Sequence, residues 1–125
     1  MITANFDGSS RGNPGPSKIG FVIYEDGTEL ESERIPIPDG TNNEAEYKGL
    51  ILLCKRLAQL NVQEVVIQGD SQLVINQVNG TWKTKKEHLQ KLGILAKKYL
   101  DQIPNWKLEW VRREKNQKAD SLAQG

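Results

Sequence analysis

The chain has 125 residues, of which 37% are hydrophobic and 26% charged, so it can form one domain with a packed core, and its composition excludes a disordered protein. No apolar run approaches the ~18 residues of a membrane-spanning helix, and the N-terminus has neither a basic leader nor an apolar block. The single cysteine, Cys54, excludes an internal disulfide bond and suits a reducing compartment. We therefore expect a cytoplasmic protein that does not bind membranes.

Charge is unevenly distributed along the chain, although the net charge is only +1. Residues 1–79 carry six Lys and Arg against eleven Asp and Glu, whereas residues 80–125 carry eleven against five. A basic part beside an acidic part suits a polyanion that binds next to a cation site. Two solvated helix faces would give the same distribution, and charge alone favours that explanation.

Three short strands open the chain. Apolar and polar residues alternate over 2–6, and further strand patterns cover 19–24 and 29–37. A loop rich in Gly and Pro separates the first two strands, and an Asp-Gly pair, a strong hairpin signal, separates the second from the third. These short connections predict an antiparallel meander, whose third strand we expect to end at the prolines of segment 36–38.

Helices and strands alternate in the rest of the chain. Thr41 and Asn42 provide a cap for the longest helix, and the apolar run Val65-Val66-Ile67 is typical of a strand buried on both faces. On the last strand, Trp106 and Trp110 share one face and are expected to pack against a helix. The pattern predicts helices at 42–60, 71–78, 88–100 and 116–123 and strands at 64–68 and 106–111. This order implies an α/β fold with a mixed sheet, helices on both of its faces and a site in the crevice at the strand ends.

One charged residue lies on the apolar side of the longest helix. At about 100° per residue, Glu46 falls in line with Leu50, Leu53 and Leu57, while the other charged side chains lie on the opposite side. A carboxylate that enters a core face needs a partner because an unpaired buried charge is very costly. The helix alone leaves open whether this partner is a cation of the protein, a network of hydrogen-bond donors or a metal ion.

Three further carboxylates occupy informative positions. Asp7 ends the first strand, Asp70 ends the buried strand and Asp120 lies in the last helix. Each has an ordinary explanation, as a turn residue, a helix cap and a surface residue respectively, and Glu46 could pair with a lysine. Taken one at a time, these ordinary explanations are favoured.

Together, the four carboxylates predict a metal site. Adjacent strands would bring Asp7 and Asp70 to one edge of the sheet, where carboxylates raise one another's pKa unless cations neutralise them. Oxygen ligands favour Mg²⁺ or Mn²⁺, and the single His and single Cys argue against zinc. Two such ions about 4 Å apart can align an attacking water and stabilise a leaving oxygen in phosphodiester cleavage.

These motifs resemble those of the ribonuclease H type 1 family. The similarity rests on short segments that occur in the family's order over nearly the whole chain. They are Phe6-Asp7-Gly8-Ser9 with Gly12-Asn13-Pro14-Gly15, Thr41-Asn42-Asn43 with Glu46, Gly69-Asp70-Ser71-Gln72, and Asn116 with Ala119-Asp120 and Leu122-Ala123. The resemblance implies a single ribonuclease H domain over 1–125, with a ribonuclease H-like five-stranded mixed sheet of order 3-2-1-4-5 whose first three strands are antiparallel.

The resemblance also implies an activity. A member of this family would be a monomeric endonuclease that hydrolyses the RNA strand of an RNA–DNA hybrid and leaves 3′-hydroxyl and 5′-phosphate ends. It would use two Mg²⁺ ions per site, with Mn²⁺ as a possible substitute. By motif position, Asp7, Glu46, Asp70 and Asp120 are the catalytic residues and metal ligands. Asp7 and Asp70 would lie nearest both ions, and Glu46 would also contact a ribose 2′-hydroxyl.

Substrate contacts follow from the same motifs. Asn13, Asn43 and Gln72 match positions that contact the minor groove of the hybrid, where 2′-hydroxyls are displayed. Asn42 belongs to the same group, and Thr41 matches a position that grips a phosphate of the DNA strand.

The chain departs from the family pattern in the loop before the last helix. Many members have a histidine there, which is thought to assist product release or proton transfer, whereas residues 112–115 contain none. We expect Arg113 or Glu114 to take part of this role, and unchanged turnover after alanine substitution at both would contradict that expectation. Because the chain ends five residues after Asp120, the last helix is short and is expected to hold Asp120 loosely.

A second departure concerns the basic handle that some members carry. Residues 80–87 leave no room for it, but Lys83, Lys85 and Lys86 form a reduced basic connector, in which Lys85 is a candidate substrate contact. Trp82 is either a platform for the sugars of the DNA strand or a partly buried anchor.

Three other functions remain open at this point. The chain could be a DNA-cutting or strand-transfer enzyme of the same fold, a nucleic-acid binder that has lost catalysis, or a domain with a structural magnesium. The Thr41-Asn42-Asn43 and Gln72 groups argue against the first because they suit 2′-hydroxyl recognition. The presence of all four acids gives the second no support.

Overall fold

The computed structural model describes residues 1–125 and contains a five-stranded sheet in the order β3-β2-β1-β4-β5. The strands are β1 (Ile2–Ser10), β2 (Gly15–Glu25), β3 (Thr28–Gly40), β4 (Glu64–Gly69) and β5 (Asn105–Trp110). Strands β1 to β3 pair antiparallel, whereas β4 runs parallel to β1 and β5 parallel to β4. The predicted strand order and the mixed α/β class are therefore confirmed.

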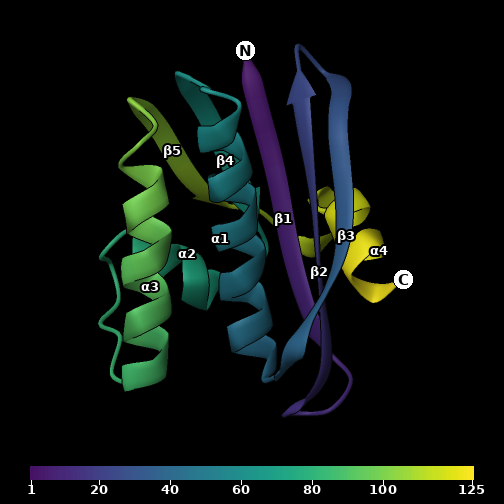
Figure 1. Ribbon diagram of the computed structural model, residues 1–125, viewed down its shortest axis with the longest axis vertical. Helices are drawn as coiled ribbons and strands as arrows, with labels where there is room; N and C mark the ends of the chain where they lie inside the picture. Colours follow the sequence, from purple (N-terminus) through teal and green to yellow (C-terminus); the bar gives the residue numbers. More distant parts are fainter.

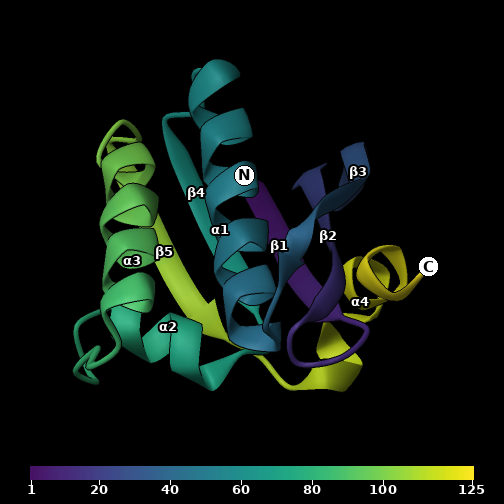
Figure 2. The same ribbon diagram turned by 60° about the horizontal axis from the view of Figure 1, so that its bottom comes forward.

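Helices cover both faces of this sheet. They are α1 (Asn42–Gln59), α2 (Gln72–Val78), α3 (Glu87–Leu100) and α4 (Gln117–Gln124), with a short 3₁₀ turn, η1 (Arg113–Lys115), before α4. Figures 1 and 2 show α1, α2 and α3 on one face and α4 on the opposite face, beside β2 and β3. None of these helices combines the length and the apolar character that crossing a membrane requires.

Helix α1 begins at the predicted cap and buries the predicted apolar face. The side chain of Thr41 accepts a hydrogen bond from the Glu44 amide (3.1 Å), and the Glu44 carboxylate accepts one from the Thr41 amide (2.8 Å), which completes a capping box. The apolar stripe of Leu50, Leu53 and Leu57 is fully buried against the sheet. Each of these side chains contributes roughly 1.5–3 kcal/mol through burial.

Two glycines bring α1 unusually close to β1. A Cβ on Gly49 would lie 2.7 Å from the carbonyl oxygen of Asp7, and a Cβ on Gly8 would overlap the backbone of Ala45. Any larger residue at these positions would push the helix away from the strand. The glycines therefore set the distance between Asp7 on β1 and Glu46 on α1.

The structure corrects three boundaries of the predicted strands. Strand β2 begins at Gly15, four residues before the predicted start at 19, because its first residues pair with β1 and β3. Strand β1 continues to Ser10 because it stays paired with β2 as far as Ser17. Strand β3 does not end at its prolines but runs to Gly40. Proline has no backbone N–H to donate, and the edge position of β3 tolerates this at Pro36 because no strand pairs with the outer side of β3. Pro38 falls at a register irregularity.

Two predictions about apolar side chains were also wrong. Val66 is only half-buried, so β4 is not fully covered on both faces. Trp110 is 43% exposed and donates its indole N–H to the carbonyl oxygen of Asp70 (3.1 Å) instead of packing under a helix. Trp106 does pack against the core, and the Lys97 ammonium of α3 lies 5.2 Å from its ring centroid.

Candidate active site

The parallel pairing of β1 with β4 places two carboxylates side by side. Phe6 on β1 is in register with Gly69 at the end of β4, so Asp7 and Asp70 follow at the same edge of the sheet. Asp7 is only 3% exposed, whereas Asp70 is partly buried. Neighbouring strand ends thus give this acid pair its position.

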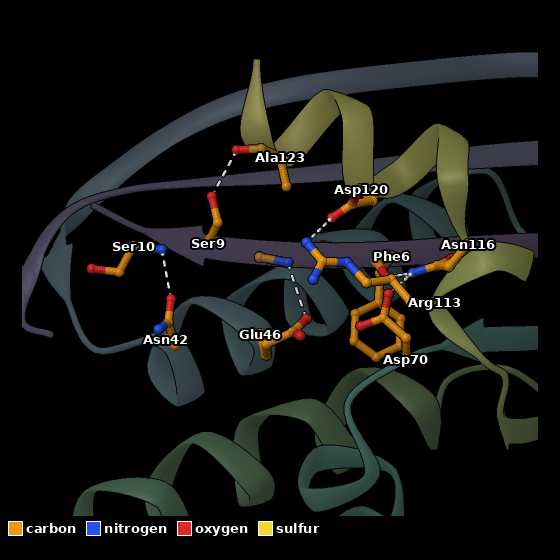
Figure 3. Close-up of polar contacts among 11 residues, drawn as sticks. Phe6, Ser9, Ser10, Asn42, Glu46, Asp70, Arg113, Asn116, Asp120 and Ala123 are labelled. Atoms are coloured by element: carbon orange, nitrogen blue, oxygen red, sulfur yellow. Dashed lines mark hydrogen bonds and ion pairs between the residues drawn. The ribbon is translucent and has the colours of Figure 1, made fainter. Parts of the chain in front are cut away.

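Glu46 joins this pair from helix α1. Its Oε1 accepts a hydrogen bond from the Gly8 amide (3.0 Å), which aims the carboxylate at the strand ends (Figure 3). Ligand oxygens of Asp7, Glu46 and Asp70 all lie within 4.8 Å of one another. The charged residue that interrupts the apolar side of α1 therefore meets two other acids, and the chain supplies no cation between them.

Asp120 lies at the margin of this cluster and has a basic partner. It is carried by α4, and its Oδ1 lies 3.3 Å from Nη2 of Arg113. The C-terminal end of α4 is fastened to the sheet, because the Ser9 hydroxyl donates to the carbonyl oxygen of Ala123 (2.8 Å) and the Arg34 guanidinium to that of Leu122 (2.9 Å).

An open cleft of about 420 Å³ contains all four carboxylates. No hydrophobic residue lines it. The lining residues are Asp7, Gly8, Ser9, Asn42, Glu46, Asp70, Arg113, Asp120 and Gln124. We call it the carboxylate cleft.

Asp7, Glu46 and Asp70 hold protons more tightly than carboxylates usually do. Burial raises the pKa of Asp7 to about 7, and the nearby carboxylates of Asp70 and Asp120 act in the same direction. Burial and the charge of Asp7 raise the pKa of Glu46 well above its ordinary value. Burial also raises the pKa of Asp70, although its hydrogen bond from Asn116 opposes the effect.

This donor set fits divalent cations. Three carboxylates from three elements converge, and Arg113, the single cation that lines the cleft, pairs with the fourth. Like charges at this separation repel strongly, and a bound cation removes the repulsion. Hard oxygen ligands favour Mg²⁺ or Mn²⁺. Asp7, Glu46, Asp70 and Asp120 are the residues that could hold such ions.

Asn116 is a site residue to which the sequence assigned no role. It is 2% exposed, and its Nδ2 donates to the carbonyl oxygen of Phe6 (2.9 Å) and to Oδ2 of Asp70 (3.0 Å). Its Oδ1 accepts from Nδ2 of Asn5 (2.9 Å). One side chain thus ties the start of α4 to β1 and fixes the Asp70 carboxylate. The signal in the sequence that could have indicated this role is that Asn116 is a polar residue of the last motif and stands beside the apolar face of a helix.

The residues predicted to contact substrate divide into two groups. Asn13, Asn42 and Thr41 are engaged within the protein: Oδ1 of Asn13 accepts from the Asn42 amide (3.0 Å), Oδ1 of Asn42 from the Ser10 amide (2.9 Å), and Thr41 caps α1. These bonds fasten the β1–β2 loop to the start of α1.

The second group is free at the surface. Asn43, Gln72 and Lys85 are exposed, and Trp82 is 46% exposed. None of them lines the carboxylate cleft. In the loop before α4, Arg113 lines the cleft, whereas Glu114 is exposed and does not.

Comparison with known proteins agrees with this geometry. A family model described as reverse transcriptase-like matches residues 5–125. A ribonuclease H of Pseudomonas putida is 30% identical over 138 residues, a match that covers 94% of this chain and 86% of the relative. The chain belongs to the ribonuclease H family.

Other family members are more similar to the chain. The ribonuclease HI of Halobacterium salinarum is 37% identical over 123 residues, and a bifunctional protein of Mycobacterium tuberculosis is 40% identical over 124 residues. Each match covers 98% of this chain, but the chain spans only 62% of the halobacterial relative and 34% of the mycobacterial one.

Solved ribonuclease H structures superimpose closely on this fold. The ribonuclease H1 of Halobacterium salinarum matches with a TM-score of 0.95, covering 98% of this chain and 94% of that one. A ribonuclease H1 in complex with an RNA/DNA hybrid matches with a TM-score of 0.92 at 33% identity, covering 99% of this chain and 94% of that one.

Proposed function

We propose that this ribonuclease H-family chain is an endoribonuclease that hydrolyses the RNA strand of RNA–DNA hybrids and leaves 5′-phosphate and 3′-hydroxyl ends. The observation that carries the proposal is the meeting of Asp7, Glu46 and Asp70 within 4.8 Å, from three elements far apart in the sequence. We further propose that residues 1–125 act as one ribonuclease H domain, monomeric and cytoplasmic. The buried free Cys54 suits a reducing compartment.

The carboxylates would hold the metal ions on which the reaction depends. Two bound Mg²⁺ ions, or Mn²⁺ in their place, would supply Lewis-acid chemistry to the attacking water and the leaving oxygen. The chain's own contribution is orientation: the Gly8 amide directs Glu46, and Asn116 directs Asp70. Because these donors are part of the fold, the acids are held in place before substrate binds.

Recognition of the hybrid would involve the surface on both sides of α1's first turn. Asn43 and Gln72 are exposed and could reach 2′-hydroxyls in the minor groove. Asn13, Asn42 and Thr41 would offer their remaining donors and acceptors there. Trp82 and Lys85 would meet the DNA strand through its sugars and phosphates.

Arg113 is the better candidate for the role of the missing loop histidine. Its guanidinium reaches Asp120 at 3.3 Å inside the cleft, whereas Glu114 is exposed and does not line the cleft. Arg113 would neutralise part of the negative charge around Asp120 as the cleaved strand leaves. Alanine at Arg113 is therefore expected to lower kcat more than alanine at Glu114.

Cleavage of labelled duplexes tests the proposed function directly. The chain is incubated with Mg²⁺ or Mn²⁺ and an RNA–DNA hybrid, an RNA duplex or a DNA duplex. We expect cleavage of the RNA of the hybrid alone, and a fall of more than about a hundredfold for Asp7→Asn because it removes a charged metal ligand. Asp101→Asn, at an exposed aspartate after α3, is the matched control and should cleave at the original rate. Cleavage of DNA, or full activity of Asp7→Asn, would contradict the proposed function.

A further inference from the structure

A second groove opens beside the carboxylate cleft, at the C-terminal end of α4. It has a volume of about 310 Å³ and is lined by residues 9–11, 16–18, 36, 37, 39, 123 and 124. We call it the lateral groove. Ser9 and Gln124 line both the lateral groove and the carboxylate cleft, so the two depressions share a wall. At this boundary, the Ser9 hydroxyl donates a hydrogen bond to the carbonyl oxygen of Ala123 (Figure 3).

The lateral groove carries cations that the fold does not use. Arg11 is exposed on the β1–β2 loop, and Lys18 is partly buried on β2 directly opposite Ser9. Neither forms an ion pair, in contrast to Arg56 and Lys118, which pair with glutamates elsewhere. The one acid in the lining, Asp39, leaves the groove with a net positive charge. A basic groove that adjoins an acidic cleft is arranged for a polyanion that contacts both.

The walls of the lateral groove are fixed by the fold. The Arg11 amide donates to the carbonyl oxygen of Pro16 (2.8 Å), which closes the β1–β2 loop. The hydroxyls of Ser10 and Ser17 donate to the carbonyl oxygens of Gly40 (2.7 Å) and Gly15 (2.9 Å). Arg11 and Lys18 therefore project from a rigid base, so little backbone entropy is lost when an anion binds between them.

We propose that the lateral groove binds backbone phosphates of the RNA strand on one side of the scissile bond, through Arg11 and Lys18. This inference rests on the proposed function. The strand whose phosphodiester lies in the carboxylate cleft is the strand that passes into a groove sharing the cleft's walls.

Binding without cleavage tests the inference independently of activity. Fluorescence anisotropy measures the Kd of a labelled hybrid for the Asp7→Asn protein, with and without further substitutions, over a series of salt concentrations. Arg11→Gln and Lys18→Gln should each weaken binding about threefold to tenfold. Each should also reduce the steepness of log Kd against log salt concentration by about one. Asp39→Asn should tighten binding, because it removes the opposing charge. Lys55→Gln, at an exposed lysine of α1 outside both depressions, should have no effect.

Neutral phosphate analogues identify the strand. Methylphosphonates placed in the RNA strand beyond the scissile bond, on one side only, should abolish the penalty of the Arg11→Gln/Lys18→Gln double variant. The same substitution in the DNA strand should leave the penalty unchanged, and the reverse pattern would overturn the inference. Hybrid cleavage by the original chain, together with unaltered Kd in all the groove variants, would also overturn it while leaving the proposed function intact. If the groove variants change the Kd as expected but the original chain cleaves no duplex, the proposed function alone is refuted.

Discussion

Asn116 shows how one uncharged side chain can organise a cluster of charges. Its amide bridges the Phe6 carbonyl, the Asp70 carboxylate and the Asn5 side chain, all from a position that is 2% exposed. The bond to Asp70 opposes the rise in that carboxyl's pKa. Asn116 therefore acts on the site through Asp70 and is a positioning residue.

Alanine at Asn116 should damage both stability and turnover. The Phe6 carbonyl would lose its side-chain partner in a buried site, which costs about 1–3 kcal/mol, and kcat should fall about tenfold or more because Asp70 loses its orienting donor. Urea unfolding and steady-state cleavage of a hybrid measure the two effects.

Asn79→Ala is the matched control for this experiment. Its Nδ2 donates to the carbonyl oxygen of Leu108 (2.9 Å), away from the carboxylate cleft. It should lose stability without the loss of kcat. Equal kcat for Asn116→Ala and the unsubstituted chain would contradict the positioning role.

At the level of elements, the site depends on the contact between α1 and β1. Glu46 reaches the strand ends because glycines at positions 8 and 49 let the two backbones approach. Helix α3 contains a glycine of the opposite kind: a Cβ on Gly93 would meet the Tyr47 ring at an ordinary 3.8 Å. The same substitution at these two helix positions should therefore have opposite effects.

Gly49→Ala is expected to destabilise the protein by about 1–3 kcal/mol because its methyl group would overlap the Asp7 carbonyl. Gly93→Ala should stabilise it by about 0.5–1 kcal/mol, since alanine is the better helix former. Differential scanning calorimetry of both variants makes the comparison. Activity should fall only in Gly49→Ala, where Asp7 is displaced relative to Glu46. If both substitutions destabilise the protein, the close contact of Gly49 with the Asp7 carbonyl does not explain the loss of stability.

At the scale of the whole molecule, the carboxylate cleft makes stability depend on pH and on metal. The pKa of Asp7 is about 7 in the folded protein against an ordinary 3.8, so the folded state binds this proton more tightly than the unfolded chain does. The resulting stabilisation is fully present below about pH 4 and is lost as the pH rises through about 7. Above that pH, Asp7 is ionised, and in the metal-free protein nothing neutralises its repulsion with the neighbouring carboxylates.

In EDTA, the free energy of unfolding should therefore fall by about 2–3 kcal/mol between pH 5 and pH 8. Mg²⁺ should stabilise the protein more at pH 8 than at pH 5, because protons compete with the metal for the same oxygens. Denaturant unfolding at both pH values, with and without Mg²⁺, measures this linkage.

Asp7→Asn supplies the control for the linkage. It should flatten the pH dependence and be more stable than the unsubstituted chain at pH 8 in EDTA. An undiminished slope in Asp7→Asn, or equal stabilisation by Mg²⁺ at both pH values, would show that the Asp7 proton is not responsible.

The sequence by itself determined the features that depend on local periodicity and spacing. Alternation and helical repeats defined the order of strands and helices, the cap at Thr41 and the alignment of Glu46 with buried leucines. It also identified the four acids as candidates. Asp7 and Asp70 end predicted strands, Glu46 interrupts an apolar helix face, and Asp120 belongs to the last of the ribonuclease H-like motifs.

Only the tertiary structure decided which of these groups meet and how they are held. The parallel register of β1 and β4 puts Asp70 beside Asp7, and the ion pair with Arg113 leaves Asp120 at the margin of the cluster. The buried bridge from Asn116 to Phe6 and the Ser9–Ala123 contact between the carboxylate cleft and the lateral groove join residues more than 100 positions apart. Such contacts leave no periodic signal, because they arise from the packing of whole elements and not from the spacing of residues along one of them.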